Sequence, residues 1–163
     1  MKLSRNRRMA LVIAGIVAAD WITKAAVQHR LPLSDRRTIV EGWLSFQHNI
    51  NPGIAWGWLR EMPDALRMPL LAVLAFVGIG ATLSIMRETK DRWIHAAGAL
   101  VLGGAVGNLG DRLLNGGVTD FIYVHFFPYV FNVADIAISI GGVLLVLRML
   151  LDRRGDGAAP TTA

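Results

Sequence analysis

Four apolar stretches, each long enough to cross a lipid bilayer, restrict this 163-residue chain to a small number of folds. A helix that spans a membrane needs roughly 20 predominantly apolar residues, at about 1.5 Å of rise per residue. The stretches cover residues 9–28, 66–86, 93–114 and 130–151. The mean hydropathy of +0.44 also exceeds that of an ordinary soluble domain. We therefore predict an all-α membrane protein in which residues 1–154 form a single domain with four transmembrane helices, followed by a disordered tail over residues 155–163.

The first apolar stretch has an alternative interpretation, as a secretory signal peptide. Basic residues precede its apolar core, as in such signals: Lys2, Arg5, Arg7 and Arg8. However, Asp20 and Trp21 follow without a clear small-x-small cleavage pattern, and the helical periodicity continues as far as Val27. We therefore interpret this stretch as the first transmembrane helix.

The positions of Lys and Arg predict how the helices are oriented, because short cytoplasmic flanks carry an excess of both. One side of the membrane receives ten of them: Lys2, Arg5, Arg7, Arg8, Arg87, Lys90, Arg92, Arg148, Arg153 and Arg154. The other side receives five: Arg30, Arg36, Arg37, Arg60 and Arg67. Both termini are therefore expected in the cytoplasm, with the loop over residues 29–65 outside.

The composition argues against several other functions. The formal net charge of +5 could indicate nucleic-acid binding, but the basic residues lie at the ends of apolar stretches rather than on one amphipathic face. The chain has no Cys, its four His are dispersed without ligand spacing, and none of its Ser lies in a Gly-x-Ser-x-Gly elbow. A Ser-Lys dyad would need Lys24, which Asp20 already neutralises, and there is no glycine-rich phosphate loop. We expect neither a nucleic-acid partner nor a metal or organic cofactor.

The outer loop carries the alternation of a β-strand. Across residues 44–50, Leu, Phe, His and Ile alternate with Ser, Gln and Asn. The Asn51-Pro52-Gly53 run that follows predicts a turn. We expect a small extracytoplasmic β-sheet lying on the membrane surface, with three indole rings in the headgroup layer: Trp43, Trp56 and Trp58.

Ionisable side chains recur within the transmembrane stretches, where they are costly and by default functional. Asp20 and Lys24 are spaced i,i+4, so they share a helix face and can neutralise one another. By the same rule, Asn108, Asp111 and Arg112 are expected to share a face of the third helix. We interpret Asp20 with Lys24, and Asp111 with Arg112 or another neighbour, as structural pairs.

Asp120 and Asp135 are different, because no Lys or Arg lies between Asn115 and Leu147 to act as a local partner. We expect Asp120 in the short outer loop between the third and fourth helices, and Asp135 one turn below the outer surface, three residues after Asn132. Two carboxyl groups that share a site do not ionise together easily, so their compensation must come from a shared proton or a distant helix. A carboxylate beside a carboxylic acid can activate water. The sequence therefore predicts a catalytic pair near the outer leaflet.

Two rival functions remain open on this reasoning. A small proton- or ion-coupled transporter would also need buried carboxylates. Against it, the carboxylates cluster on one side of the membrane, and the second helix has no charged residue between Pro69 and Met86. A purely structural membrane subunit would leave Asp120 without a role. Nothing in the sequence implies an oligomer.

The ordered polar residues resemble those of the lipoprotein signal peptidases, also called signal peptidase II, a family of bacterial aspartic peptidases. The resemblance spans nearly the whole chain and rests on five segments: Asp20 with Lys24, Asn51-Pro52-Gly53-Ile54-Ala55, Gly104 with Gly107-Asn108-Leu109-Gly110-Asp111-Arg112, Val118-Thr119-Asp120-Phe121, and Phe131-Asn132-Val133-Ala134-Asp135. One departure lies in the outer loop, where the family usually has Asn-x-Gly-Ala-Ala-Phe and this chain has Ile54 and Trp56.

The resemblance implies a role for each matching residue. Asp120 and Asp135 match the family's catalytic pair. Eight positions match residues that support the pair or line the substrate groove: Asn51, Gly53, Gly104, Asn108, Arg112, Val118, Asn132 and Ala134. The structural polar set matches at three positions: Asp20, Lys24 and Asp111. The resemblance also implies a short surface helix, which matches Leu59 to Arg67.

The resemblance implies an activity as well. The family removes signal peptides from lipid-modified bacterial prolipoproteins, cutting on the amino side of a diacylglyceryl-modified cysteine and using no cofactor. The expected partners are such a prolipoprotein and the lipids of the bacterial cytoplasmic (inner) membrane. We expect water activated between Asp120 and Asp135 to hydrolyse the peptide bond, with the acyl chains in a groove between helices.

Overall fold

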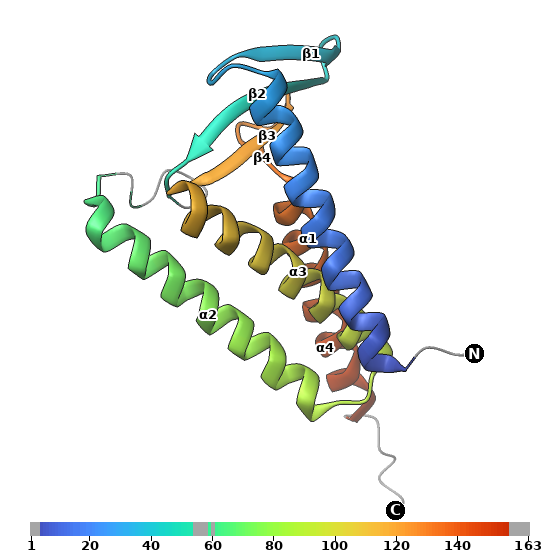
Figure 1. Ribbon diagram of the computed structural model, residues 1–163. Helices are drawn as coiled ribbons and strands as arrows, with labels where there is room; N and C mark the ends of the chain where they lie inside the picture. Colours follow the sequence, from blue (N-terminus) through green and yellow to red (C-terminus); the bar gives the residue numbers. More distant parts are fainter. Residues whose placement is uncertain (1–3, 54–58, 60, 157–163) are drawn as a thin grey trace, which may run out of the picture.

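The structure is a computed structural model that describes residues 4–53, 59 and 61–156. The described residues form four long helices that carry a four-stranded antiparallel sheet at one end of the bundle (Figure 1). The helices are α1 (Arg5–Arg30), α2 (Asp64–Glu88), α3 (Arg92–Asn115) and α4 (Val133–Asp156). Each contains an apolar window long enough to span a bilayer. The prediction of a protein with four transmembrane helices and a small sheet is confirmed.

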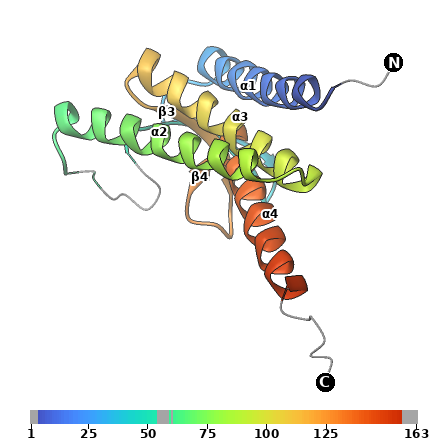
Figure 2. The ribbon, with the colours of Figure 1, turned by 90° about the horizontal axis from the view of Figure 1, so that it is seen from below.

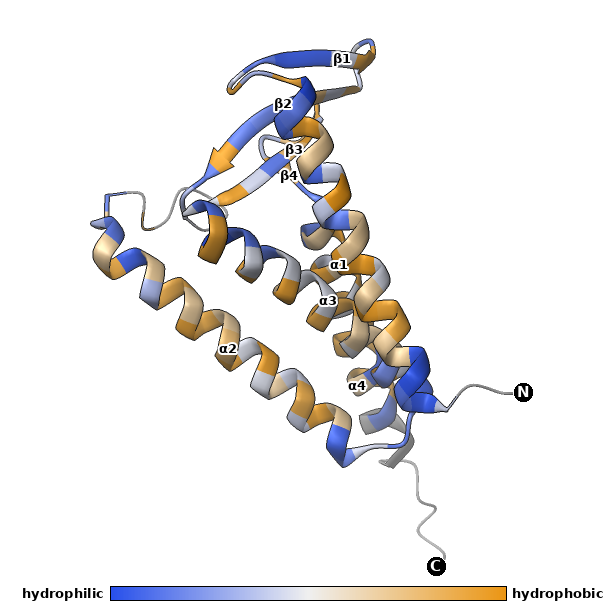
Figure 3. Cartoon of the chain, viewed as in Figure 1, coloured by the Kyte–Doolittle hydropathy of each residue, from blue (hydrophilic) through white to orange (hydrophobic). Residues whose placement is uncertain are grey.

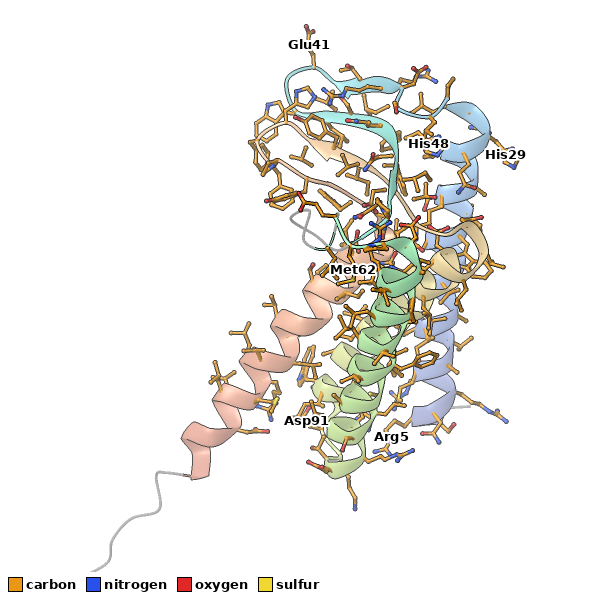
Figure 4. The ribbon with its side chains drawn as sticks, turned by 90° about the vertical axis from the view of Figure 1, so that its left-hand side faces the viewer. Arg5, His29, Glu41, His48, Met62 and Asp91 are labelled. Atoms are coloured by element: carbon orange, nitrogen blue, oxygen red, sulfur yellow. The ribbon has the colours of Figure 1, made fainter. Side chains whose placement is uncertain are left out.

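The bundle has an apolar middle between two hydrophilic ends. Arg5 and Asp91 lie at one end, where α1 begins and α4 finishes, whereas Glu41 and His48 lie at the other (Figures 1 and 4). Apolar residues dominate the middle of the helices, and hydrophilic residues gather in the sheet and at the opposite end of the bundle (Figure 3). This banding is what a bilayer around the helices requires.

Local signals explain where α3 begins and ends. The carboxylate of Asp91 accepts hydrogen bonds from the backbone N–H groups of Trp93 (2.6 Å) and Ile94 (3.4 Å), which caps the first turn. At the other end Gly116 adopts a left-handed conformation with φ of 70°, and its N–H donates to the carbonyl of Arg112. This glycine turns the chain from α3 into the sheet.

α3 is the central helix. It packs against each of the other three helices, most extensively against α4, and α2 diverges from α4 (Figure 2). Within its apolar window 61% of the residues are buried, against 22% or less in the other three helices. Its glycines permit this close packing: a Cβ on Gly104 would lie 2.4 Å from the carbonyl oxygen of Ala134, and one on Gly107 would lie 2.8 Å from Asp20 Oδ2.

The sheet has the order β1 (Arg36–Val40), β2 (Leu44–Asn51), β3 (Val118–Val124) and β4 (Val130–Phe131). The predicted strand over residues 44–50 is confirmed as β2, but its alternation is interrupted. The register between β2 and β3 shifts between Phe46 and Asn49, and Ser45 and His48, three residues apart, are both buried. Such a bulge reverses the face to which the later side chains point.

Asp120 lies in a strand, and the prediction that it occupies a loop is wrong. It belongs to β3, where it is paired with Asn49 of β2. The segment Val118–Val124 is rich in β-branched and aromatic residues, which favour a strand, and β2 and β4 flank it on both sides. Pairing with β2, which is distant in the chain, and with β4, which follows closely, therefore decides the conformation of this short connection.

The segments at the starts of α2 and α4 also differ from the expectation. The structure places Asp64 to Arg67 in the first turn of α2 and not in a separate surface helix over Leu59 to Arg67. Pro63 precedes this turn with φ of −55°, and proline suits the start of a helix because it has no N–H to leave unpaired. In the fourth apolar stretch, residues 130–131 form β4, so α4 begins at residue 133.

Several sequence predictions concern residues outside the described part of the chain. They are the contour of the outer loop at Ile54, Ala55, Trp56 and Trp58, and Arg60 within the expected surface helix. At the end of the chain, α4 continues through Gly155 and Asp156, and the rest of the predicted tail, residues 157–163, lies outside the described residues.

Candidate active site

Asp120 is held by two amide side chains. Asn51 Nδ2 donates to its Oδ2 at 2.9 Å, and Asn132 Nδ2 donates to its Oδ1 at 2.7 Å. The residue is only 2% exposed. Burial, and next the nearby charge of Asp135, raise the pKa of Asp120 to about 7, although both amide donors act to lower it. Asp120 therefore keeps its proton at pH values where an exposed aspartate has lost it.

Asp135 is fixed by the start of α4. Its Oδ1 accepts a hydrogen bond from Asn108 Nδ2 at 2.8 Å, and its Oδ2 accepts one from the backbone N–H of Asn132 at 3.2 Å. In return, Asn132 Oδ1 accepts from the backbone N–H of Asp135 at 2.9 Å. This reciprocal arrangement is a capping box, so the same contacts that start the helix also orient the carboxylate. Because Asn132 also donates to Asp120, a single asparagine connects both carboxyl groups.

Both carboxyl groups line a groove with a volume of about 1290 Å³. The part nearest the sheet comes from the end of β2 and from the connection between β3 and β4, and it includes the polar side chains of Asn49 and Asn51 and the aromatic rings of Phe126, Phe127 and Tyr129. Its inner part is formed by residues of the diverging helices α2, α3 and α4, which include Ala75, Gly78, Val101, Ala105, Ile138, Ser139 and Ile140. One site therefore offers a polar end beside the carboxyl groups and a mainly apolar end between helices, which suits an amphiphilic ligand.

Lys24 is buried, and it contacts the side chain of Asn108 at the amide oxygen, whereas Asp135 contacts the amide nitrogen. Its Nζ is 2.7 Å from Asp20 Oδ2 and 3.4 Å from Asp111 Oδ2, and it donates to Asn108 Oδ1 at 3.0 Å. The predicted pairing of Asp20 with Lys24 is confirmed. Asp111 takes Lys24 as its basic partner. Because Asn108 also donates to Asp135, the ammonium group of Lys24 fixes which end of the amide faces the carboxylate.

The residues of α3 do not all share one face, contrary to the expectation. Asn108 and Arg112 line the groove, whereas Asp111 faces Lys24 and accepts a hydrogen bond from the backbone N–H of Thr119 at 2.6 Å. Consecutive residues in an α-helix are about 100° apart around the axis, so Asp111 and its neighbour point in different directions. The two side chains act in separate places.

Gly53 and Arg112 hold the turn that carries Asn51. The N–H of Gly53 donates to Asn51 Oδ1 at 3.0 Å, which confirms the predicted turn, and its carbonyl accepts from Arg112 Nη2 at 3.3 Å. Val118 is paired with Asn51 across the two strands. All four residues line the groove.

Three of the residues expected to support the carboxyl pair or to line the groove are buried beside the groove and do not line it. Gly104 permits the close contact of α3 with α4, and Ala134 is fully buried with its N–H donating to Asp20 Oδ1 at 2.9 Å. Asn132, also fully buried, acts on the carboxyl groups directly. Asp20 therefore anchors α4 to α1 from the far side of the helix start.

Sequence reasoning missed much of the inner groove. It assigned no role to Ala75 and Gly78 of α2, to Ser139 of α4, or to the aromatic connection over residues 126–131. Ser139 follows Asp135 at i,i+4, a spacing that signals a shared helix face. No comparable signal marks the α2 residues, because α2 has no charged residue between Pro69 and Met86 to single out one face.

The fold and the groove define a multi-pass membrane protein with a carboxyl-lined site at the end of the helices that carries the sheet. A family model described as Signal peptidase (SPase) II matches residues 12–151. The chain therefore belongs to the signal peptidase II family and is a membrane peptidase, so the resemblance is confirmed.

Individual relatives agree over most of the chain. It is 42% identical over 140 residues to a lipoprotein signal peptidase of Aquifex aeolicus, which covers 84% of this chain and 82% of that protein. It is 39% identical over 156 residues to a lipoprotein signal peptidase of Rhizorhabdus wittichii. That match covers 92% of this chain and 90% of the relative. A solved structure described as a bacterial membrane enzyme is similar in fold, with a TM-score of 0.82 at 24% identity, and covers 95% of this chain and 94% of that one.

Proposed function

We propose that this protein removes signal peptides from diacylglyceryl-modified prolipoproteins in the bacterial cytoplasmic membrane, cutting on the amino side of the lipidated cysteine. Membership of the family and the function for which its relatives are named support the reaction class. The observation that carries the proposal is the continuity of the groove, from Asp120 and Asp135 to the space between the helices. A substrate with a peptide bond and acyl chains on adjacent atoms needs both environments in one site.

In the proposed mechanism Asp120 and Asp135 share one proton. The ionised member takes a proton from water, and the protonated member supports the developing oxyanion and then the leaving amine. The raised pKa of Asp120, about 7, supports a pair that keeps one proton near neutral pH, with apparent pKa values that belong to the pair. Water is the only nucleophile in this mechanism.

Three asparagines prepare the carboxyl groups for this reaction. Asn51 and Asn132 bind Asp120, and Asn108 binds Asp135. Because these donors are fixed before substrate arrives, little reorganisation is needed as charge moves during hydrolysis. We assign Asp20, Lys24 and Asp111 a structural role behind the site.

We also propose the orientation. The basic residues at the end of the bundle away from the sheet favour cytoplasmic termini, with the carboxyl pair near the outer leaflet. A lipid-anchored substrate then presents its scissile bond close to the headgroups.

The direct test uses the purified protein in liposomes. Lipidated prolipoprotein should be cleaved at the amino side of the modified cysteine, as identified by mass spectrometry, and the same protein without the lipid should be cleaved far more slowly. Proton flux across the same liposomes tests the transporter alternative. Flux without cleavage of the lipidated substrate would refute the proposed function.

The rate of cleavage should depend on pH with a decline as the pH rises through about 7. Burial and the charge of Asp135 raise the pKa of Asp120 to that value from 3.8, so above it the pair loses its shared proton and its acid. Between pH 3.8 and about 7, Asp120 keeps a proton in the folded protein that it has released in the unfolded chain. The contribution of Asp120 to the free energy of unfolding therefore falls as the pH rises. Initial rates on both sides of this pH, with melting temperatures as the control for unfolding, check the prediction, and a flat profile contradicts it.

Gly78 should be needed for the acyl chains to fit. It lines the groove, and a Cβ placed on it would meet no atom of another described element within 4 Å, so Gly78→Leu places its side chain in groove space. Overfilling a binding space typically costs 1–3 kcal/mol, so we expect KM for the lipidated substrate to rise about 10-fold.

Gly80→Leu is the matched control for this substitution. Gly80 lies in the same helix, its Cβ would also meet nothing within 4 Å, and it does not line the groove. The test is to measure KM of both variants for the same lipidated substrate. Equal KM values for the two leucine variants would show that α2 does not bound the lipid site.

A further inference from the structure

Ser139 places a hydroxyl in the inner groove. It follows Asp135 by four residues, so it lies one turn further along α4, about 6 Å along the axis, on the same helix face. It is exposed and lines the groove. The groove residues around this depth are otherwise apolar or glycine: Ala75, Gly78, Val101, Ala105, Ile138 and Ile140.

This hydroxyl has no hydrogen-bond partner among the described residues. Hydroxyl side chains in helices often donate to the carbonyl four residues earlier. Two threonines of this protein do so: Thr23 donates to Ala19 at 2.7 Å and Thr82 donates to Gly78 at 2.8 Å. An unpaired hydroxyl in apolar surroundings is unfavourable, which makes Ser139 a donor ready for a ligand.

We propose that Ser139 donates a hydrogen bond to an ester carbonyl of the substrate's diacylglyceryl group. This inference rests on the proposed function. With the scissile bond at Asp120 and Asp135, the thioether and the glyceryl carbons come next along the groove, followed by the ester carbonyls and then by the acyl chains. An ester carbonyl only accepts hydrogen bonds, and a serine hydroxyl can donate one. The site thus recognises the glyceryl ester in addition to the hydrocarbon.

The same chemistry could come from a membrane phospholipid, which also carries glyceryl esters. The experiment therefore compares two substrates with identical peptides, one with a diacylglyceryl cysteine and one with a dialkylglyceryl cysteine, whose ether oxygens replace the ester groups. Wild type, Ser139→Ala and the control Ser84→Ala, an exposed serine of α2 outside the groove, are assayed in the same liposomes. Melting temperatures confirm that the variants are folded.

We expect Ser139→Ala to raise KM for the ester substrate about 3- to 10-fold, the loss typical of one hydrogen bond, and to leave KM for the ether substrate unchanged. Ser84→Ala should change neither value. An equal loss on both substrates would indicate packing or a bound phospholipid, and would overturn the inference, as would no loss on the ester substrate. If wild type cleaves neither lipidated substrate, the proposed function itself fails. If wild type cleaves both substrates and the effect of Ser139→Ala does not depend on whether the substrate carries esters or ethers, only the role of Ser139 is refuted.

Discussion

Asp120→Asn and Asp135→Asn, made separately, are each expected to lower the cleavage rate of lipidated prolipoprotein by about 10²- to 10⁴-fold, the usual worth of a general acid or base. Each substitution keeps the size of the side chain and removes its titrating oxygen. Either one also prevents the pair from sharing a proton, so neither variant can supply both a base and an acid. Turnover measured under saturating substrate tests this expectation.

The control for both is Asp35→Asn, an exposed aspartate on the same side of the membrane that does not line the groove. It should cleave like wild type. The melting temperature separates lost chemistry from lost folding, and the two asparagine variants should remain folded because each keeps the size and polarity of the side chain. Near-normal turnover by Asp120→Asn or by Asp135→Asn would defeat the assignment of the catalytic pair.

Lys24→Met should produce the largest loss of stability. Lys24 is only 3% exposed, and its ammonium group balances two carboxylates, Asp20 at 2.7 Å and Asp111 at 3.4 Å. Removing one partner of a buried ion pair typically costs 3–5 kcal/mol, because the remaining charge is left uncompensated. We expect a correspondingly lower free energy of unfolding, with a marked fall in the melting temperature in detergent micelles. Asn108 also loses the donor that orients it, so turnover should fall as well.

Lys90→Met is the matched control, since Lys90 is an exposed lysine between α2 and α3. It should melt like wild type. Asp20→Asn should be milder than Lys24→Met, because Lys24 keeps Asp111, and it should reduce stability more than turnover. A melting temperature of Lys24→Met equal to that of wild type would mean that the three charges do not stabilise the bundle.

The helices could be predicted from the sequence because hydrophobicity along a transmembrane segment is a local property. The predicted windows lie within the observed helices except at Val130 to Asn132, where strand pairing intervenes. The ends of the helices were harder to predict, because they depend on capping residues. One is Ser4, whose Oγ accepts a hydrogen bond from the backbone N–H of Arg7 at 3.4 Å. The strands β1, β3 and β4 were not predicted from the sequence. β1 and β4 are short and pair with neighbouring strands, whereas β3 pairs with β2, about 70 residues earlier in the chain.

For the site, the lack of local basic partners singled out Asp120 and Asp135, and the structure brings both to one groove. The same argument left their compensation open between a shared proton and a distant helix. The structure adds amide donors, and Lys24 reaches Asn108 across 84 residues of sequence. A contact of that range depends on how α1 packs against α3, which no spacing rule within one helix can supply. The α2 residues that line the groove could not be predicted either, because they are defined by how α2 packs against the other helices.

The loose association of α2 with the rest of the bundle has a consequence for how molecules reach the site. α2 packs against α3 but has no extensive contact with α4, and the inner groove lies where these helices diverge. A ligand embedded in the bilayer can therefore enter sideways by two-dimensional diffusion, without lifting its hydrocarbon into water. Under the proposed function, the lipid bilayer is the reservoir that sets the effective concentration of substrate and receives the trimmed product.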